Sequence, residues 1–134
     1  MALTKGDDFP IHQTAEPIAY SGTDRNFYDR YFFNGYHPQS GEDFFAAAFG
    51  VYPHLNVVDA AFVVVRNGVE TALHASGWLV DRLDLKVGPV AIEILEPLHR
   101  LSLTVDSPEH GLKAEITFES RAHPIEEPRF VRRQ

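Results

Sequence analysis

Between residues 44 and 119, strand-like segments follow one another almost without interruption, and the boundaries are marked by pairs of turn-forming residues. Four such pairs stand out: Asn67-Gly68, Gly88-Pro89, Glu96-Pro97 and Ser107-Pro108. Asn-Gly accepts positive φ at both central turn positions, and proline cannot donate a hydrogen bond to a strand ladder, so a sheet can reverse direction at each pair. The pattern predicts an all-β, antiparallel meander that forms a barrel or a β-sandwich.

The individual segments differ in which faces they bury. Residues 57–66 are apolar on both faces, which is typical of a central strand. Residues 79–87 alternate between apolar and charged side chains, which predicts a half-solvated strand. Loops are expected at residues 37–43 and 52–56. The remaining expected strands are residues 28–36, 44–52, 69–76, 90–95, 98–105 and 112–119, with a short one at 16–20.

The length of 134 residues predicts one domain. A chain of this size buries roughly 65–70% of the surface that its unfolded form exposes, so it can build a core without metal or disulfide. We expect a flexible N-terminal arm over residues 1–15 and a single β-domain over residues 16–121. Residues 122–134 are rich in proline and charge and predict a linker or tail.

Charge and composition exclude several classes of protein. The net charge is −7, and no Lys/Arg cluster precedes Arg129, so the chain lacks the basic surface that nucleic acids or anionic membranes need. There are no cysteines, which excludes disulfides and thiol nucleophiles and fits a reducing compartment. The N-terminus has no signal-peptide core, and the longest apolar run, residues 60–65, is too short to span a bilayer. We therefore expect a cytoplasmic protein.

One face of the strand expected at residues 44–52 carries unusually small side chains in its middle. Its members are Phe44, Ala46, Ala48, Gly50 and Tyr52. Side chains alternate along a strand, so these five residues share a face. Either another element packs very close to that face, or a cavity opens over it.

Asp59 lies in the middle of the apolar run 57–65, on the face that carries Val57, Ala61 and Val63. A buried carboxylate without a partner is unfavourable, so Asp59 must be paired, neutral or beside a wet cavity. It is a candidate proton donor or polar anchor for a ligand. The structural alternative is an ion pair with Arg30 or Arg82.

Residues 24–36 are the densest patch of aromatic residues interleaved with charged ones, and they include tyrosine hydroxyls and the Asp29 carboxylate. Such a patch can hold an apolar molecule that carries one polar group. The alternative is that the hydroxyls lie at a sheet edge and the charges pair on the surface. The tyrosines concerned are Tyr28, Tyr31 and Tyr36.

The other chemistry-bearing residues form no motif. The seven histidines are scattered without metal-ligand spacing, so we expect no metal. No serine lies in a nucleophile elbow, and phosphate-binding and dinucleotide-binding fingerprints are absent, so we expect no cofactor.

Several segments resemble the N-terminal module of a group of bacterial proteins related to the carotenoid hydratase (hydroxyneurosporene synthase) superfamily. They are residues 24–36, Gly50-Val51-Tyr52-Pro53, Asp59-Ala60-Ala61-Phe62, Val87-Gly88-Pro89 and Glu96-Pro97-Leu98. The resemblance runs from about residue 12 to residue 129. It implies a lipocalin-like β-module, followed in relatives by a second one, that holds apolar substrates such as isoprenoids while acid–base groups add water or cyclise them. No catalytic signature of that superfamily can be placed on this chain.

Three functions follow as hypotheses. The first is a lipocalin-like domain that binds an apolar, isoprenoid-like or lipid-like small molecule. The second is an enzyme of hydratase, isomerase or cyclase type, or part of one, with Asp59 or Asp29 as proton donor. The third is an interaction module that packs on a second β-module in cis or on a homodimer partner. The expected ligand-binding residues are Tyr28, Tyr31, Tyr36, Phe44, Ala46, Ala48, Tyr52 and Asp59.

Overall fold

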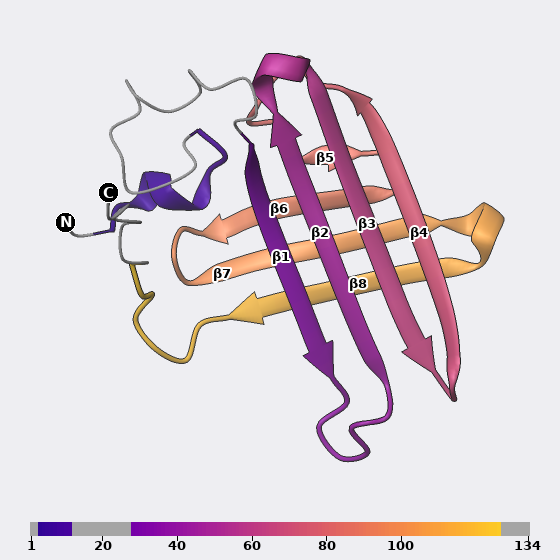
Figure 1. Cartoon of the computed structure of the whole chain (residues 1–134). Helices are drawn as coiled ribbons and strands as arrows, with labels where there is room; N and C mark the ends of the chain where they lie inside the picture. Colours follow the sequence, from indigo (N-terminus) through magenta and orange to yellow (C-terminus); the bar gives the residue numbers. More distant parts are fainter. Residues whose placement is uncertain (1–2, 12–27, 127–134) are drawn as a thin grey trace, which may run out of the picture.

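A computed structural model describes residues 3–11 and 28–126 of the chain. These residues form two antiparallel four-stranded sheets that pack face to face, with their strands crossing at a steep angle (Figure 1). The expected strand at residues 16–20 lies outside the described residues, as do residues 24–27 of the aromatic patch and most of the expected tail.

Each sheet is a simple meander in which sequential strands are neighbours. The first sheet contains β1 (Asp29–Tyr36), β2 (Phe44–Tyr52), β3 (Val57–Arg66) and β4 (Val69–Trp78). The second sheet contains β5 (Lys86–Val87), β6 (Val90–Glu96), β7 (Arg100–Ser107) and β8 (Leu112–Glu119). The predicted all-β antiparallel meander is confirmed in its sandwich form, because no strand of the described chain joins the two sheets into a closed barrel.

Short 3₁₀ helices connect or precede the strands: η1 (Lys5–Asp8), η2 (Pro53–Leu55) and η3 (Pro108–His110). The Asn67-Gly68 pair makes the β3–β4 hairpin with φ angles of 51° and 74°, as the two-residue turn requires. It sets the register in which Arg66 lies opposite Val69.

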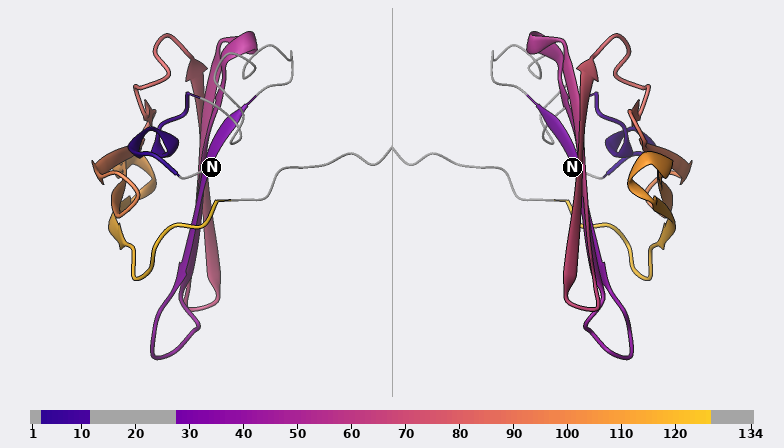
Figure 2. Two further views of the ribbon diagram at one scale, coloured as in Figure 1. Left: turned by 90° about the vertical axis from the view of Figure 1, so that its left-hand side faces the viewer. Right: turned by 90° about the vertical axis from the view of Figure 1, so that its right-hand side faces the viewer.

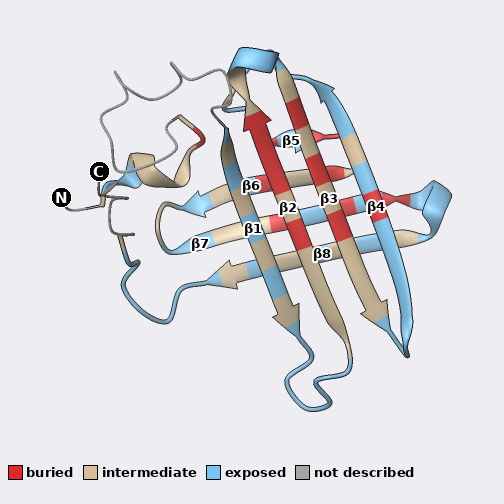
Figure 3. Cartoon of the chain, viewed as in Figure 1, coloured by how far each residue is buried: buried red, intermediate tan, exposed pale blue. Residues whose placement is uncertain are grey.

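The core lies between the sheets, where the inner faces of the central strands meet (Figure 3). Phe49 and Phe62 contribute the largest buried side chains of the first sheet, and Leu103 and Val105 lie against them from the second. Close packing of large apolar side chains from both layers stabilises the sandwich through buried area.

The predicted strand over residues 79–87 is wrong for most of its length, because only Lys86–Val87 is a strand. Asp81 starts a turn instead: its carboxylate accepts a hydrogen bond from the Leu83 amide at 2.9 Å, and its carbonyl accepts one from the Asp84 amide at 3.2 Å. An aspartate that bonds the backbone two residues later favours a turn over a strand ladder. Alternation alone therefore predicts a longer strand than the one observed.

Residues 3–11, which we expected to be part of a flexible arm, contact both sheets in the structure. Asp8 accepts hydrogen bonds from the Tyr31 hydroxyl, through its carbonyl, and from the Leu98 amide, through its carboxylate. Arg82 Nε donates to the Pro10 carbonyl at 2.7 Å. These contacts hold the N-terminal segment at one edge of the sandwich, beside β1 (Figure 1).

The first sheet has a second face, directed away from the second sheet, which we call the outer face. Seen from the side, the described chain forms two layers, and no described element lies over the outer face (Figure 2). The two central strands nevertheless place apolar residues there: Phe44, Ala46 and Ala48 from β2, and Val57, Ala61, Val63 and Val65 from β3. A sheet that is apolar on both faces is typical of a layer that is covered on both sides.

Candidate functional site

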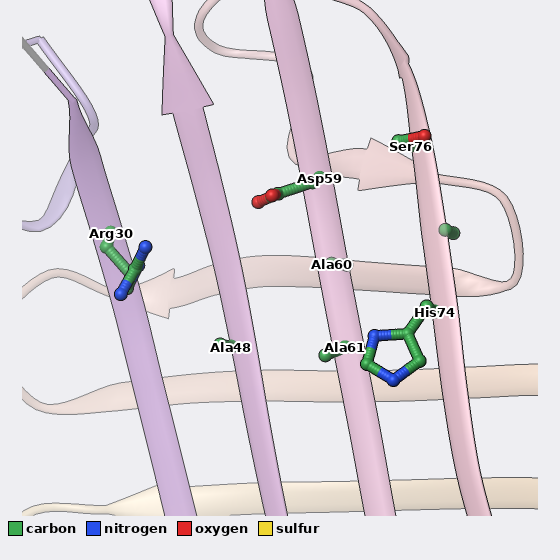
Figure 4. A pocket seen from close by; sticks show the side chains of 8 residues that line it. Arg30, Ala48, Asp59, Ala60, Ala61, His74 and Ser76 are labelled. Atoms are coloured by element: carbon green, nitrogen blue, oxygen red, sulfur yellow. The ribbon is translucent and has the colours of Figure 1, made fainter. Parts of the chain in front are cut away.

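An open depression of about 430 Å³ lies on the outer face, over the middle of the first sheet (Figure 4). Its volume falls within the range of small-molecule sites. Four polar side chains border it, namely Arg30, Asp59, His74 and Ser76, and Ala48 and Ala61 form its floor.

Strand register explains why these residues meet. Asp59 lies opposite Gly50 of β2 on one side and Ser76 of β4 on the other, and Gly50 lies opposite Arg30 of β1. These four residues form a row across the sheet in which the two central positions are a glycine and an aspartate.

The next row of the outer face consists of Phe32, Ala48, Ala61 and His74. In it, large side chains on the two edge strands flank two methyl groups on the central strands. The depression forms because β2 and β3 carry small side chains here, while the flanking strands β1 and β4 carry larger ones.

A polar cluster lies at the end of the depression where β1 begins. Arg30 Nη2 donates a hydrogen bond to the Tyr52 hydroxyl at 3.1 Å, and the guanidinium carbon lies 4.9 Å from the centroid of the Tyr28 ring. The rings of Tyr28 and Tyr52 are 5.8 Å apart. The guanidinium is thus held by one hydrogen bond and one cation–π contact.

The neighbours of Arg30 also affect its proton affinity. The hydrogen bond to Tyr52 raises the pKa of Arg30 above its usual value, and the negative charge of Asp59 adds to this effect. Figure 4 shows Asp59 leaning from β3 toward β2, over the position of Gly50. The depression therefore carries a cation and a carboxylate in the same row of the outer face, on either side of Gly50.

The outer face brings together most of the residues predicted to bind a ligand. Tyr28 and Tyr52 lie at one end of this face, and Tyr36 and Phe44 lie at the other, where their rings are 5.0 Å apart. Ala46, Ala48 and Asp59 lie between the two ends.

Tyr31 and Asp29 occupy the opposite, inner face of β1 and do not reach the depression. Burial, followed by the charges of Asp29 and Asp8, raises the pKa of the Tyr31 hydroxyl. Asp29 lies 3.9 Å from Arg82, and both side chains are largely buried. Asp29 therefore lies beside Arg82 between the sheets, where its role is structural, and it does not share a site with Asp59.

His74 and Ser76 border the depression, although no sequence motif singled them out. Counting back from the Asn67-Gly68 turn pairs His74 with Ala61 and Ser76 with Asp59, as observed. The hairpin register was therefore the signal that could have found them.

In residues 3–11 and 28–126, no three His, Cys, Asp or Glu side chains come together as a metal site would require. The helices in the same residues are all too short or too polar to cross a bilayer.

The chain was compared with protein families, curated proteins and solved structures. The profile of DUF8625, a family of unknown function, matches residues 3–134, which is nearly the whole chain. No curated protein matches the sequence. No solved structure matches it either. The chain therefore belongs to DUF8625, a family of unknown function.

Proposed function

We propose that this domain binds an elongated apolar small molecule that carries a hydroxyl group, and that it does so on the outer face of the first sheet. The observation that supports this best is the floor of Ala48 and Ala61, which ends at the Arg30 and Asp59 side chains. An apolar surface with a few convergent polar groups is typical of ligand sites.

The apolar part of the ligand would lie along β2 and β3. The floor offers little side-chain volume, so a flat or chain-like molecule can come close to the sheet. Phe32 and Trp78 are 65% and 82% exposed at the two sides of this face, so they have apolar surface left to contribute. Each 100 Å² of apolar surface removed from water contributes about 2.5 kcal/mol, before the cost of association.

The polar part would lie at the Arg30–Asp59 end. A guanidinium only donates hydrogen bonds, and an ionised carboxylate only accepts them. A hydroxyl group does both, so it can accept from Arg30 and donate to Asp59 at the same time. A ligand with an ether or an aldehyde at this position would leave Asp59 without a donor.

Retinol is a suitable probe, because it is a chain-like polyene with a terminal hydroxyl. Its fluorescence should rise and saturate with added protein, with a Kd in the micromolar range. Ala61→Phe should weaken binding at least tenfold, because the ring fills the floor. Ala72→Phe is the matched control, since Ala72 lies on the same outer face but does not border the depression.

The hydroxyl is tested separately with retinyl methyl ether. The wild-type chain should prefer retinol, and Asp59→Ala should remove that preference. The proposal fails if neither polyene binds saturably, or if Ala61→Phe and Ala72→Phe bind retinol equally well.

A second candidate is an interaction module, which is favoured by the three exposed rings on the same face. Phe32, Tyr36 and Trp78 are 65%, 67% and 82% exposed and are spread over this face, and exposed aromatic side chains are typical of a surface that another protein covers. The partner would be a second β-module in cis or a second copy of this chain. Light scattering at rising concentration tests the second copy: Trp78→Ser should shift a dimer toward monomer, and a wild-type monomer at all concentrations would contradict it.

Two further expectations belong to this proposal. The lack of cysteine supports a cytoplasmic location. An isoprenoid-like ligand is what the resemblance to the carotenoid hydratase superfamily implies, and that relation stays a prediction.

A further inference from the structure

A second hollow of about 370 Å³ opens between the two sheets at the edge opposite the N-terminal segment. It arises because the β3–β4 hairpin extends past β8, the edge strand of the second sheet, so the inner face at the hairpin end is left partly uncovered (Figures 1 and 2). We call this hollow the edge groove.

The interior of the edge groove is apolar. Phe62 and Val64 line it from β3, and Leu112 and Ala114 line it from the start of β8. Phe62 is almost fully buried, so the groove reaches to the margin of the core. An apolar chain that enters here would contact both sheets.

The charged lining of the edge groove is entirely positive. Arg66 and Lys113 border it, and no carboxylate does, in a chain whose net charge is −7. Arg66 lies 3.9 Å from Asp43, and Lys113 lies 3.4 Å from Glu115, but the four side chains are 73%, 38%, 70% and 71% exposed. Exposed pairs of this kind are worth about 0–1 kcal/mol, so an incoming anion can compete for both cations.

The mouth is also unobstructed at Gly111, which lines the groove. Its φ is 63°, a conformation that favours glycine, and a Cβ at this position would meet open space. The groove thus has an apolar interior, two cations at its rim and a bare backbone turn beside them.

From this geometry we propose that the edge groove binds the carboxylate of a single-chain amphiphile, with the apolar chain between the sheets and the headgroup at Arg66 and Lys113. This site is separate from the outer-face depression, and no described residue lines both. A guanidinium and an ammonium each donate hydrogen bonds to carboxylates.

Dodecanoate, used below its micellar concentration, is the probe, and calorimetric titration measures its Kd. We expect saturable binding with one dodecanoate per chain, and at least tenfold weaker binding of dodecyltrimethylammonium. The double variant Arg66→Gln/Lys113→Gln should weaken dodecanoate binding about tenfold, while dodecan-1-ol binding stays within twofold.

The matched control is Lys86→Gln/Arg100→Gln, which removes the same charge from exposed positions of the second sheet that do not line the groove. It should leave the dodecanoate Kd within twofold of wild type. Ala114→Phe fills the groove and should abolish binding. If Ala114→Phe unfolds, the two charge variants still test the proposal. Their four substituted side chains are exposed, so these variants should fold.

Any of three binding results would overturn the inference: no saturable dodecanoate binding, equal binding of the cationic amphiphile, or equal losses in the two charge variants. A chemical-shift result can overturn it as well. Amide chemical shifts show where the probe lies. Changes at Leu112 and Ala114 support the edge groove, whereas changes confined to Ala48 and Ala61 would assign dodecanoate to the outer face. Ala61→Phe should leave dodecanoate binding unchanged, so failure at one site is distinguishable from failure at the other.

Discussion

The carboxylate of Asp59 lies directly over Gly50, with Oδ1 only 2.9 Å from the point that a Cβ on Gly50 would occupy. The Tyr52 hydroxyl lies 3.0 Å from the same point. Glycine therefore leaves the space that the Asp59 carboxylate and the Tyr52 hydroxyl approach, and β2 provides that space by lacking one side chain.

Gly50→Ala should weaken retinol binding at least fivefold, because the new methyl group displaces both Asp59 and Tyr52. The stability should stay within about 1 kcal/mol of wild type, since the displaced atoms are ends of flexible side chains and alanine suits a strand better than glycine. Fluorescence titration and urea denaturation measure the two quantities. The control is Gly77→Ala in the same sheet, where a Cβ would meet only Val87, at an ordinary 3.6 Å. Unchanged binding in Gly50→Ala would contradict the assigned geometry.

Gly35→Ala should behave in the opposite way and lower the free energy of unfolding by about 1–3 kcal/mol through overpacking. A Cβ at Gly35 would lie 3.0 Å from Cζ of Phe45, and closer still to its Cε1. The ring cannot move away freely, since its centroid lies 6.3 Å from that of Phe62 and 6.1 Å from that of Phe118.

A double-mutant cycle with Phe45→Leu checks the Gly35 prediction by urea denaturation. The smaller side chain should relieve the clash, so the double variant should lose less stability than the two single variants together. Strict additivity would show that Gly35 and Phe45 do not interact.

The Tyr31 hydroxyl should make the fold sensitive to alkaline pH. Burial raises its pKa above the usual value of about 10, so above that pH the unfolded chain loses a proton that the folded chain keeps. The contribution of the Tyr31 hydroxyl to the free energy of unfolding is fully present below pH 10 and is lost as the pH rises above 10. Because the ring is only partly buried, we expect a loss of about 1 kcal/mol between pH 9 and pH 11.

Thermal melts of Tyr31→Phe and Tyr36→Phe separate this effect from general alkaline unfolding. Tyr31→Phe should be less stable than wild type at pH 7, because its hydrogen bond to Asp8 is gone, but it should lose less stability on going from pH 9 to pH 11. Tyr36 is 67% exposed, so its variant should follow the wild-type pH profile. A parallel profile for Tyr31→Phe would refute the assignment.

Asp8→Ala should lower the free energy of unfolding by about 1–3 kcal/mol, because the Leu98 amide would lose its acceptor at a partly buried site. Leu98 has a φ of 66°, so its backbone already adopts a conformation that non-glycine residues rarely take. Asp84→Ala, at an exposed loop position, is the control and should stay within about 0.5 kcal/mol of wild type. Equal stability of the two variants would mean that residues 3–11 contribute little to the fold.

Much of the architecture could be predicted from local signals. The observed bounds of β2, β3 and β8 are those expected from the sequence, because turn residues delimit these strands and their own composition favours strands. The segment at residues 79–85 could not be assigned from alternation, since the decisive interaction is one hydrogen bond from Leu83 to the Asp81 side chain.

The candidate site was only partly predictable. Period-two alternation placed Asp59 with Ala61, and Gly50 with Ala48, each pair on one face of its strand. It could not tell which face would meet the second sheet, because residues 44–52 and 57–65 are apolar on both. The inner position of Tyr31, by contrast, follows from alternation alone: within β1 it shares a face with Asp29 and Phe33, and Arg30 and Tyr36 lie on the other face.

The position of Asp59 also matters before the chain has folded. It is the only Asp, Glu, Lys or Arg between Phe44 and Val65, a stretch that is rich in Ala, Val and Phe. Uncharged segments with high strand propensity self-associate when an unfolded chain exposes them, and a single charge in the middle opposes that association. We therefore expect Asp59 to oppose aggregation of the unfolded chain, and neutral variants at this position to be more prone to aggregation during expression and refolding.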